Sequence, residues 1–191
     1  MTLPLAAARG QSRPGQARLS AGGVNVTWMK LEMMAGKDVD LRVRLQTDPQ
    51  LMAELGGPRP REAIERAHAR SLALAAEGKC WPLRIIPAGE SSPAGGVDVF
   101  ESSHDGEPIY EIGWMILPEF QNRGIASQAV RKVLEWARAD RKFRQIHAFP
   151  AVTNGPSNKI CEKTGFTNLG ESDVEFAGRA LRCNHWRVDL F

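Results

Sequence analysis

The sequence predicts one α+β domain, a mixed sheet packed by helices. Segments typical of strands and of helices follow one another without the strict alternation of a parallel α/β fold. Hydrophobic residues make up 42% and charged residues 25% of the 191 residues, which is ordinary for a chain with a proper core. A chain of this length usually forms one domain with at most a short appendage.

The first 23 residues differ from the rest. An apolar patch at residues 3–8 is followed by Arg9, Arg13 and Arg18 among Gly, Ser and Pro. A secretion signal carries its positive charge before the apolar stretch, which is the opposite order. We therefore expect residues 1–23 to be a disordered leader or an overlong start, and residues 24–191 to be the domain.

The first elements of the domain are a strand at 24–34, a short helix at 48–55 and an ambiguous segment between them. In residues 37–46, apolar residues alternate as in a strand and also recur four apart as in a helix, so both assignments stay open. The helix at 48–55 would be capped by Asp48, with Pro49 in its first turn.

The clearest helix is 60–78, which is rich in Ala, Glu, Arg and Leu and ends at Gly78. Residues 81–86 form a predicted strand, 87–96 a loop and 97–103 another strand. The turn residues at 104–108 predict a hairpin into a strand at 109–117.

The second half contains an amphipathic helix at 124–139, a strand at 143–149 and a helix at 156–164. The inner face of the first helix consists of Ile125, Ala129, Val130, Val133, Leu134 and Ala137. The second helix would be capped by Asn154 or Gly155 and ended by Gly165. The last strands are predicted at 166–169 and 181–190.

Composition argues against several classes of function. The net charge of +3 is too small for a nucleic-acid-binding face. No apolar run approaches the roughly 20 residues that cross a bilayer, so we expect no membrane span. Three widely spaced cysteines (Cys80, Cys161 and Cys183) form neither a metal pattern nor a disulfide framework. We expect a cytoplasmic protein without a metal.

The most informative segment is 111–130, a strand, a glycine-containing loop and the start of a helix. The loop Gln121-Asn-Arg-Gly124-Ile-Ala126 matches the pattern Gln/Arg-x-x-Gly-x-Gly/Ala. Such a junction directs unpaired backbone N–H groups and the positive end of the helix dipole at one spot, which suits a phosphate or pyrophosphate. Gly124 and Ala126 can also serve tight packing of the helix against the strand, and both roles can hold together.

A second motif follows about thirty residues later, in the run Asn154-Gly-Pro-Ser157-Asn-Lys-Ile-Cys-Glu-Lys-Thr-Gly165-Phe. Together the two motifs resemble the hallmark motifs of the GNAT superfamily of acetyl-CoA-dependent N-acyltransferases. The upstream part, including 47–56, is similar to the branch that acetylates ribosomal-protein N-termini. The resemblance covers about 24–190 and favours a helix at 37–46.

The resemblance implies a GNAT fold, with a splayed, mostly antiparallel seven-stranded sheet flanked by helices. Backbone groups of Met115 and Ile116 would face the pantetheine arm and the thioester carbonyl of acetyl-CoA. Asn154 would hydrogen-bond the pantetheine, with Ser157 or Asn158 near it; a purely structural role for Ser157 in the first helical turn stays open. The pyrophosphate would be wrapped by the amides of Gln121, Asn122, Arg123, Gly124, Ile125, Ala126 and Ser127.

Acetyl transfer to an amine needs a neutral amine, donors for the oxyanion and a proton for the leaving thiolate. Many relatives donate that proton from a tyrosine, but here Cys161 occupies the position and the only tyrosine is Tyr110. Cys161 could replace it, or be a buried structural residue. Glu111, His147 and His185 are candidate bases, and each has a structural alternative.

Three hypotheses follow. The first is an N-acetyltransferase that passes acetyl directly to an amine of a small molecule or of a protein N-terminus. The second is an acyl-CoA-binding sensor without catalysis, and the third is a general nucleotide-binding domain. Acetyl-CoA and an amine are the expected partners, with a homodimer expected by analogy only. The residues do not name the amine.

Overall fold

The computed structural model describes residues 29–191. The predicted leader at 1–23 and the first residues of the strand predicted at 24–34 lie outside the described residues. Within residues 29–191 the chain forms a seven-stranded sheet in the order β1-β2-β3-β4-β5-β7-β6. The predicted α+β fold is confirmed.

The sheet is antiparallel except where β4 and β5 pair in parallel. Its strands are β1 (Met29–Met33), β2 (Cys80–Pro87), β3 (Gly95–His104), β4 (Glu107–Ile116), β5 (Gln145–Ala148), β6 (Thr167–Phe176) and β7 (Arg179–Asp189). The turn residues predicted at 104–108 join β3 and β4, with Asp105 and Gly106 at positive φ. Near the end of the chain, β6 is longer than the strand predicted at 166–169, because it continues to Phe176.

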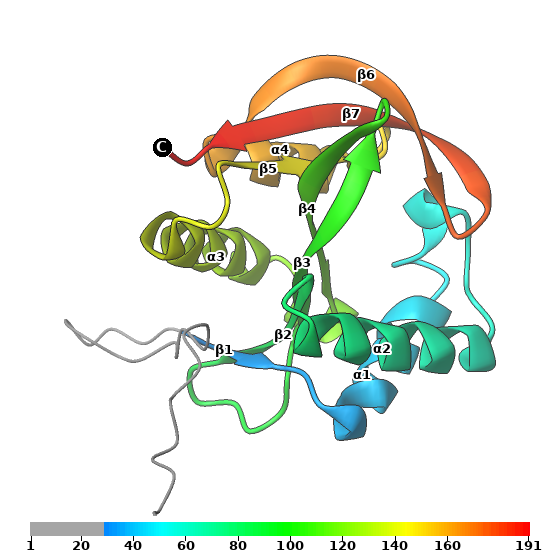
Figure 1. Ribbon diagram of the computed structural model, residues 1–191. Helices are drawn as coiled ribbons and strands as arrows, with labels where there is room; N and C mark the ends of the chain where they lie inside the picture. The colour runs from blue at the N-terminus through cyan, green and yellow to red at the C-terminus, as the bar shows by residue number, and fades with distance from the viewer. Residues whose placement is uncertain (1–28) are drawn as a thin grey trace, which may run out of the picture.

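The helices cover both faces of the sheet. They are α1 (Val39–Thr47), α2 (Arg61–Ala76), α3 (Ile125–Asp140) and α4 (Gly155–Lys163). Figure 1 shows α3 on one side of β3 and β4, with α1 and α2 on the other. The ambiguous segment at 37–46 is thus helical over most of its length, because α1 turns Leu41 and Leu45 together into a buried cluster with Leu117.

The main core lies between α3 and the sheet. The buried residues of α3 are the six that the sequence predicts for its inner face: Ile125, Ala129, Val130, Val133, Leu134 and Ala137. They pack in one cluster with Val97 and Val99 of β3 and Ile112 of β4. The core therefore fixes the end of β4 against the first turn of α3, which places the loop between them.

The helix predicted at 48–55 is wrong in its length and type. Only Ala53–Leu55 is helical, as one turn of 3-10 helix. Asp48 does not cap this helical turn, whose N-cap is Met52; its Oδ1 instead accepts the N–H groups of Gln50 at 2.8 Å and Leu51 at 3.0 Å in the turn that precedes it. The two glycines that follow, Gly56 and Gly57, have positive φ and end the segment.

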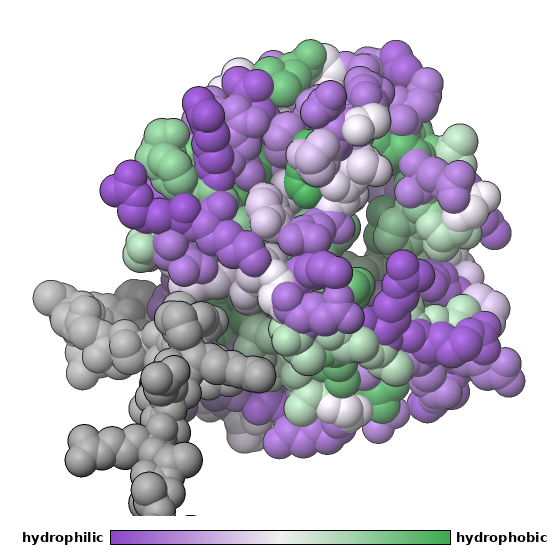
Figure 2. Space-filling model, viewed as in Figure 1, coloured by the Kyte–Doolittle hydropathy of each residue, from purple (hydrophilic) through white to green (hydrophobic). Residues whose placement is uncertain are grey.

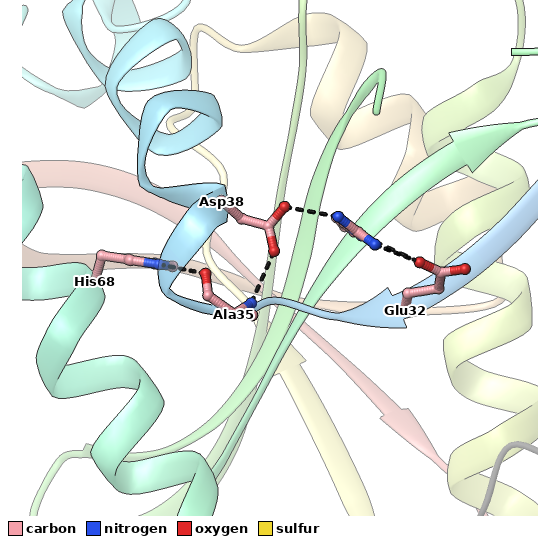
Figure 3. Close-up of polar contacts among 5 residues, drawn as sticks. Glu32, Ala35, Asp38 and His68 are labelled. Carbon is pink, nitrogen blue, oxygen red and sulfur yellow. Dashed lines mark hydrogen bonds and ion pairs between the residues drawn. The ribbon is translucent and has the colours of Figure 1, made fainter. Parts of the chain in front are cut away.

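A polar network holds the start of α1 against the sheet (Figure 3). Asp38, which is buried, accepts the Ala35 N–H at 2.8 Å and the Arg84 guanidinium at 2.8 Å. Arg84 also donates to Glu32 at 2.6 Å, and His68 Nε2 lies 3.0 Å from the Ala35 carbonyl. Because β1, β2, α2 and the turn that leads into α1 each contribute a group, the network fixes the position of the start of α1 beside the sheet.

No helix in the described part of the chain is both long and apolar enough to cross a membrane.

Candidate active site

The sheet opens between β4 and β5. One register pair joins them, Glu111 with His147. Beyond it β4 continues to Ile116, whereas β5 ends at Ala148. The strands therefore separate, and a cavity of about 1370 Å³ extends from this opening. The space-filling view shows a hollow to the right of centre, beside β3 and β4 (Figure 2).

The loop before α3 presents unpaired backbone donors to this cavity. Among residues 29–191, the backbone N–H groups of residues 122–127 form no hydrogen bond. Gln121 differs, because its N–H donates to the Pro118 carbonyl at 3.2 Å. The ring of free amides thus begins at Asn122, one residue later than the motif suggests.

The backbone of this loop is held in a specific conformation. Asn122 has φ +60° and Gly124 has φ +70°, so two left-handed residues alternate with ordinary ones. Glycine adopts this conformation without the penalty of a Cβ. A Cβ on Gly124 would meet only Gln128 Nε2, at 3.6 Å, so the packing of helix against strand does not require this glycine. The Gln121 side chain donates to the Ile116 carbonyl at 3.0 Å and ties the loop to β4.

The free amides and the N-terminus of α3 offer the N–H donors and the positive potential that favour an anion. Every loop residue from Gln121 to Ser127 except Arg123 lines the cavity. The Arg123 guanidinium lies over the Phe120 ring, 5.3 Å from its centroid, and 3.8 Å from Glu90. Two lysines of α4, Lys159 and Lys163, also line the cavity, although the sequence motifs do not single them out.

On the second side of the opening, Asn154 caps α4. Its Oδ1 accepts the Ser157 N–H at 3.1 Å, and both residues line the cavity. Asn158 does not line it. Its amide donates to the carbonyls of Ala151 and Asn154, and its oxygen accepts from Asn184 and Trp186, all at 2.8–2.9 Å. These four bonds use its whole capacity, so Asn158 joins α4 to β7 rather than offering a group to a ligand.

Glu111 is the acidic residue of β4 that lines the cavity where the strands separate. It lies on the face of β4 that it shares with Gly113 and Met115, and all three line the cavity. Burial raises the pKa of its carboxyl to about 6, against the opposing effect of a hydrogen bond with Ser102. A carboxyl with this pKa is ionised at neutral pH and close enough to it to exchange protons.

The two predicted histidines lie together but not on the cavity wall. His147 Nδ1 and His185 Nε2 are 2.7 Å apart. Burial, and then the charge of His185, lowers the pKa of His147 to about 4; burial also lowers the pKa of His185. Phe149 does line the cavity, and it stacks on the His185 ring with centroids 4.6 Å apart. The pair supports the wall while staying neutral.

A third histidine, His104, reaches the cavity from the end of β3. Its ring lies edge-on to His185, with centroids 4.6 Å apart, and its Nε2 is 3.4 Å from Asp105. Sequence reasoning missed it because it stands in a turn motif. The signal that could have found it is the alternation along β3, because His104 and Ser102 share a face with Phe100, the register partner of Glu111.

Cys161 lies away from the cavity. It is fully buried in the main core, and burial raises the pKa of its thiol to about 12. Tyr110 lies on the α3 side of the sheet, where its ring contacts Phe143 at 4.8 Å between centroids. All three cysteines are buried as free thiols. Residues 29–191 hold no group of three His, Cys, Asp or Glu side chains placed to bind a metal.

Comparison with known proteins gives the family. A model described as the GNAT acetyltransferase domain matches residues 29–167. The chain is 37% identical over 65 residues to YnaD, an uncharacterized N-acetyltransferase of Bacillus subtilis (strain 168). That alignment spans 34% of this chain and 38% of YnaD, so less than two thirds of the relative is covered.

Solved structures of acetyltransferases share the fold. Spermidine N-acetyltransferase from Vibrio cholerae, solved with CoA and spermine, superposes with a TM-score of 0.71 at 18% identity, covering 86% of this chain and 96% of that one. An acetyltransferase from Salmonella typhimurium that modifies the N-terminal serine of ribosomal protein L7/L12 superposes with a TM-score of 0.70 at 18% identity. The superposition covers 85% of this chain and 95% of that one. With the family model spanning most of the described residues, the chain belongs to the GNAT acetyltransferase family.

Proposed function

We propose that the protein is an N-acetyltransferase that transfers acetyl from acetyl-CoA to a primary amine. The observation that carries the proposal is the set of unpaired N–H groups at residues 122–127, aimed into the cavity where β4 and β5 separate. A diphosphate matches these donors in charge and hydrogen bonding. The CoA-bound Vibrio cholerae structure, which has the same fold, supports this choice of ligand.

The remaining contacts to acetyl-CoA follow from the same opening. The pantetheine arm would lie along the unpaired edge of β4, with Met115 and Ile116 on one side and Asn154 and Ser157 on the other. The volume of the cavity, about 1370 Å³, exceeds the roughly 300–1,000 Å³ that is usual for the pocket of a single small ligand. It therefore has room for a second substrate beside the thioester.

The chemistry is a direct transfer. The amine loses its proton to Glu111, directly or through a water, and its nitrogen attacks the thioester carbon. The new C–N bond forms as the C–S bond breaks, and CoA leaves as a thiolate that takes up a proton. Backbone N–H groups of β4 would stabilise the oxyanion. Positioning and these donors would supply most of the acceleration.

The thiolate takes its proton from solvent in this proposal. Cys161 is buried away from the cavity, with its thiol pKa raised to about 12, and Tyr110 packs on the opposite face of the sheet. Without a side-chain acid, the reaction lacks the acceleration that general acid catalysis would add. The contributions of positioning and of the oxyanion donors remain. The cytoplasmic location and a homodimer stay predictions.

The test is release of free CoA thiol from acetyl-CoA in the presence of a panel of amines and peptides. We expect at least one amine to accelerate release, with the acetylated amine as the second product. Binding of acetyl-CoA without release for any acceptor would instead favour the non-catalytic sensor. Failure of acetyl-CoA to bind would contradict both.

A further inference from the structure

The cavity wall carries apolar side chains that the two cores leave uncovered. In the described part of the chain, two clusters of buried residues form the cores. One lies between α3 and the sheet, and the other lies where α1 packs on the sheet. Six half-buried apolar residues line the cavity and belong to neither core: Leu55, Phe100, Phe149, Val174, Phe176 and Leu181. Covering an apolar surface of this kind with an apolar ligand lowers the free energy of the complex.

The upper part of this wall comes from the β6–β7 hairpin, which arches over the opening (Figure 1). Val174 pairs with Leu181 across the hairpin, so both point to the same face, and both line the cavity. Their neighbours Asp173 and Arg182 form an ion pair at 3.1 Å, and the exposed Asp173 also lines the cavity. The hairpin therefore presents the apolar pair of Val174 and Leu181 to the cavity, beside an acidic residue that already has a cationic partner.

The hairpin is attached to the segment between α1 and α2. Arg179 donates to the Gly56 carbonyl, and the Arg59 guanidinium lies 5.9 Å from the centroid of the Phe176 ring. Thr153, in the loop between β5 and α4, also contacts this segment by donating to Glu54. These contacts bridge the cavity at the end distant from α3, so the space beneath the hairpin is covered on its outer side. A compact ligand fits there better than a broad protein surface.

The floor opposite this apolar face is unusually bare. Gly113 lies in the middle of β4 on the cavity face, and a Cβ placed on it would meet nothing within 4 Å. Its φ is not among the positive values, so the backbone does not require glycine there. Neither packing nor conformation explains the residue, whereas clearance for a ligand next to Glu111 does.

The carboxylates that line the cavity differ in their exposure and in their partners. Asp98 faces Gly113 across the β3–β4 pair, but Arg42 already neutralises it at 2.7 Å. Asp173 is paired with Arg182, and Glu54 accepts a hydrogen bond from Thr153. The other two lining carboxylates, Asp105 and Glu175, are exposed to solvent. Glu111 is the carboxylate that shares its strand face with the bare floor, so one ammonium group can be bound there beside an apolar surface.

We propose that the acceptor is a primary amine attached to a compact apolar group. The nitrogen lies at Glu111, the adjoining carbon lies over Gly113, and the apolar group is covered by Val174, Phe176 and Leu181. The inference rests on the proposed acetyl transfer, and it names the class of acceptor that the same site takes.

Three probes separate the possibilities: 2-phenylethylamine as an amine on an apolar group, putrescine as a dication, and a short peptide with a free N-terminal alanine. We expect kcat/KM for 2-phenylethylamine to exceed that of the other two by at least about tenfold, the lower end of the discrimination that apolar pockets achieve. A preference for putrescine or for the peptide would overturn the inference.

Two substitutions locate the apolar group. Leu181→Ser should lower kcat/KM for 2-phenylethylamine about tenfold while leaving the Kd for acetyl-CoA unchanged. Gly113→Val should do the same by filling the space above β4. Leu169→Ser is the matched control, because Leu169 lies on the same two-stranded ribbon, is 45% exposed and does not line the cavity.

The outcomes distinguish the class of acceptor from acetyl transfer itself. Equal effects of Leu181→Ser and Leu169→Ser on kcat/KM, with acetyl-CoA binding intact, would overturn the placement of the acceptor and leave acetyl transfer standing. Absence of acetyl-CoA binding by the unmodified protein would remove the proposed function itself. Unchanged acetyl-CoA affinity in the variants shows that they are folded.

Discussion

Glu111 of β4 and His147 of β5 face each other in the one register pair that joins these two strands. They mark the closed end of the opening, because the strands diverge beyond them. This position explains the two pKa shifts found there: burial raises the pKa of Glu111 to about 6 and lowers the pKa of His147 to about 4. Both shifts favour the neutral form, as expected where water is excluded.

The pH dependence of activity tests the role of Glu111. As a base it must be ionised, so kcat/KM should rise with pH through about 6, the pKa of its carboxyl. Glu111→Gln should lower kcat/KM by roughly 10² to 10⁴ and remove this limb of the profile. Glu107→Gln, at an exposed position of the same strand, is the control. An unchanged profile in Glu111→Gln would assign the base elsewhere.

The same carboxyl should also affect stability. Its folded pKa, about 6, lies above the ordinary 4.5, so the folded state holds the proton more tightly. The stability it contributes is present below pH 4.5 and is lost as pH rises through 6, a change of about 2 kcal/mol. Urea unfolding should therefore show Glu111→Gln gaining about that much relative to the unmodified protein between pH 4 and pH 8. A gain that does not vary with pH would contradict the burial of a titrating carboxyl.

Cys161 provides a prediction of the opposite kind. Because its side chain is fully buried away from the cavity, Cys161→Ala should keep kcat within about threefold while costing about 1–2 kcal/mol of stability. Steady-state rates and urea unfolding measure the two effects. A loss of turnover as large as that of Glu111→Gln, in a folded variant, would make Cys161 the missing acid.

Two glycines of the β3–β4 pair should respond differently to the same change. A Cβ on Gly95 would lie 2.1 Å from the Met115 carbonyl oxygen and 3.0 Å from Ile116 Cα, so Gly95→Ala must displace β4. We expect a loss of about 2 kcal/mol or more in the free energy of unfolding. Gly113→Ala, with open space above it, should be neutral or slightly stabilising. Similar losses in both variants would contradict the close approach at Gly95.

The fold was largely predictable where one physical signal dominated. The apolar spacing of α3 gave its buried face residue by residue, because a helix between sheet and solvent has little choice of orientation. The sequence does not predict the end of β6, because acidic residues alternate with others at 171–176 and this segment contains no apolar run. Its strand conformation depends on pairing with β7. At 37–46 the period was ambiguous, and packing of Leu41 and Leu45 against Leu117 decided it.

The site was predictable in its backbone part and less so in its side chains. The loop motif names the residues that turn their amides outward, since local geometry sets that direction. The pairing of His147 with His185, and the use of all four Asn158 hydrogen bonds inside the protein, depend on contacts between β5, α4 and β7 that no local pattern encodes. The apolar face of the β6–β7 hairpin is likewise visible only once the hairpin arches over β4.

Calorimetric titration of acetyl-CoA into the unmodified protein and into Gly124→Val tests whether residues 122–127 bind the diphosphate. Valine cannot adopt φ +70° without strain, so the variant should turn its amides away from the diphosphate and lose binding by at least about 100-fold. Gly170→Val, at φ +113° outside the cavity, carries comparable strain and should bind normally. Undiminished binding of acetyl-CoA by a folded Gly124→Val variant would contradict the assignment of residues 122–127 as the diphosphate site.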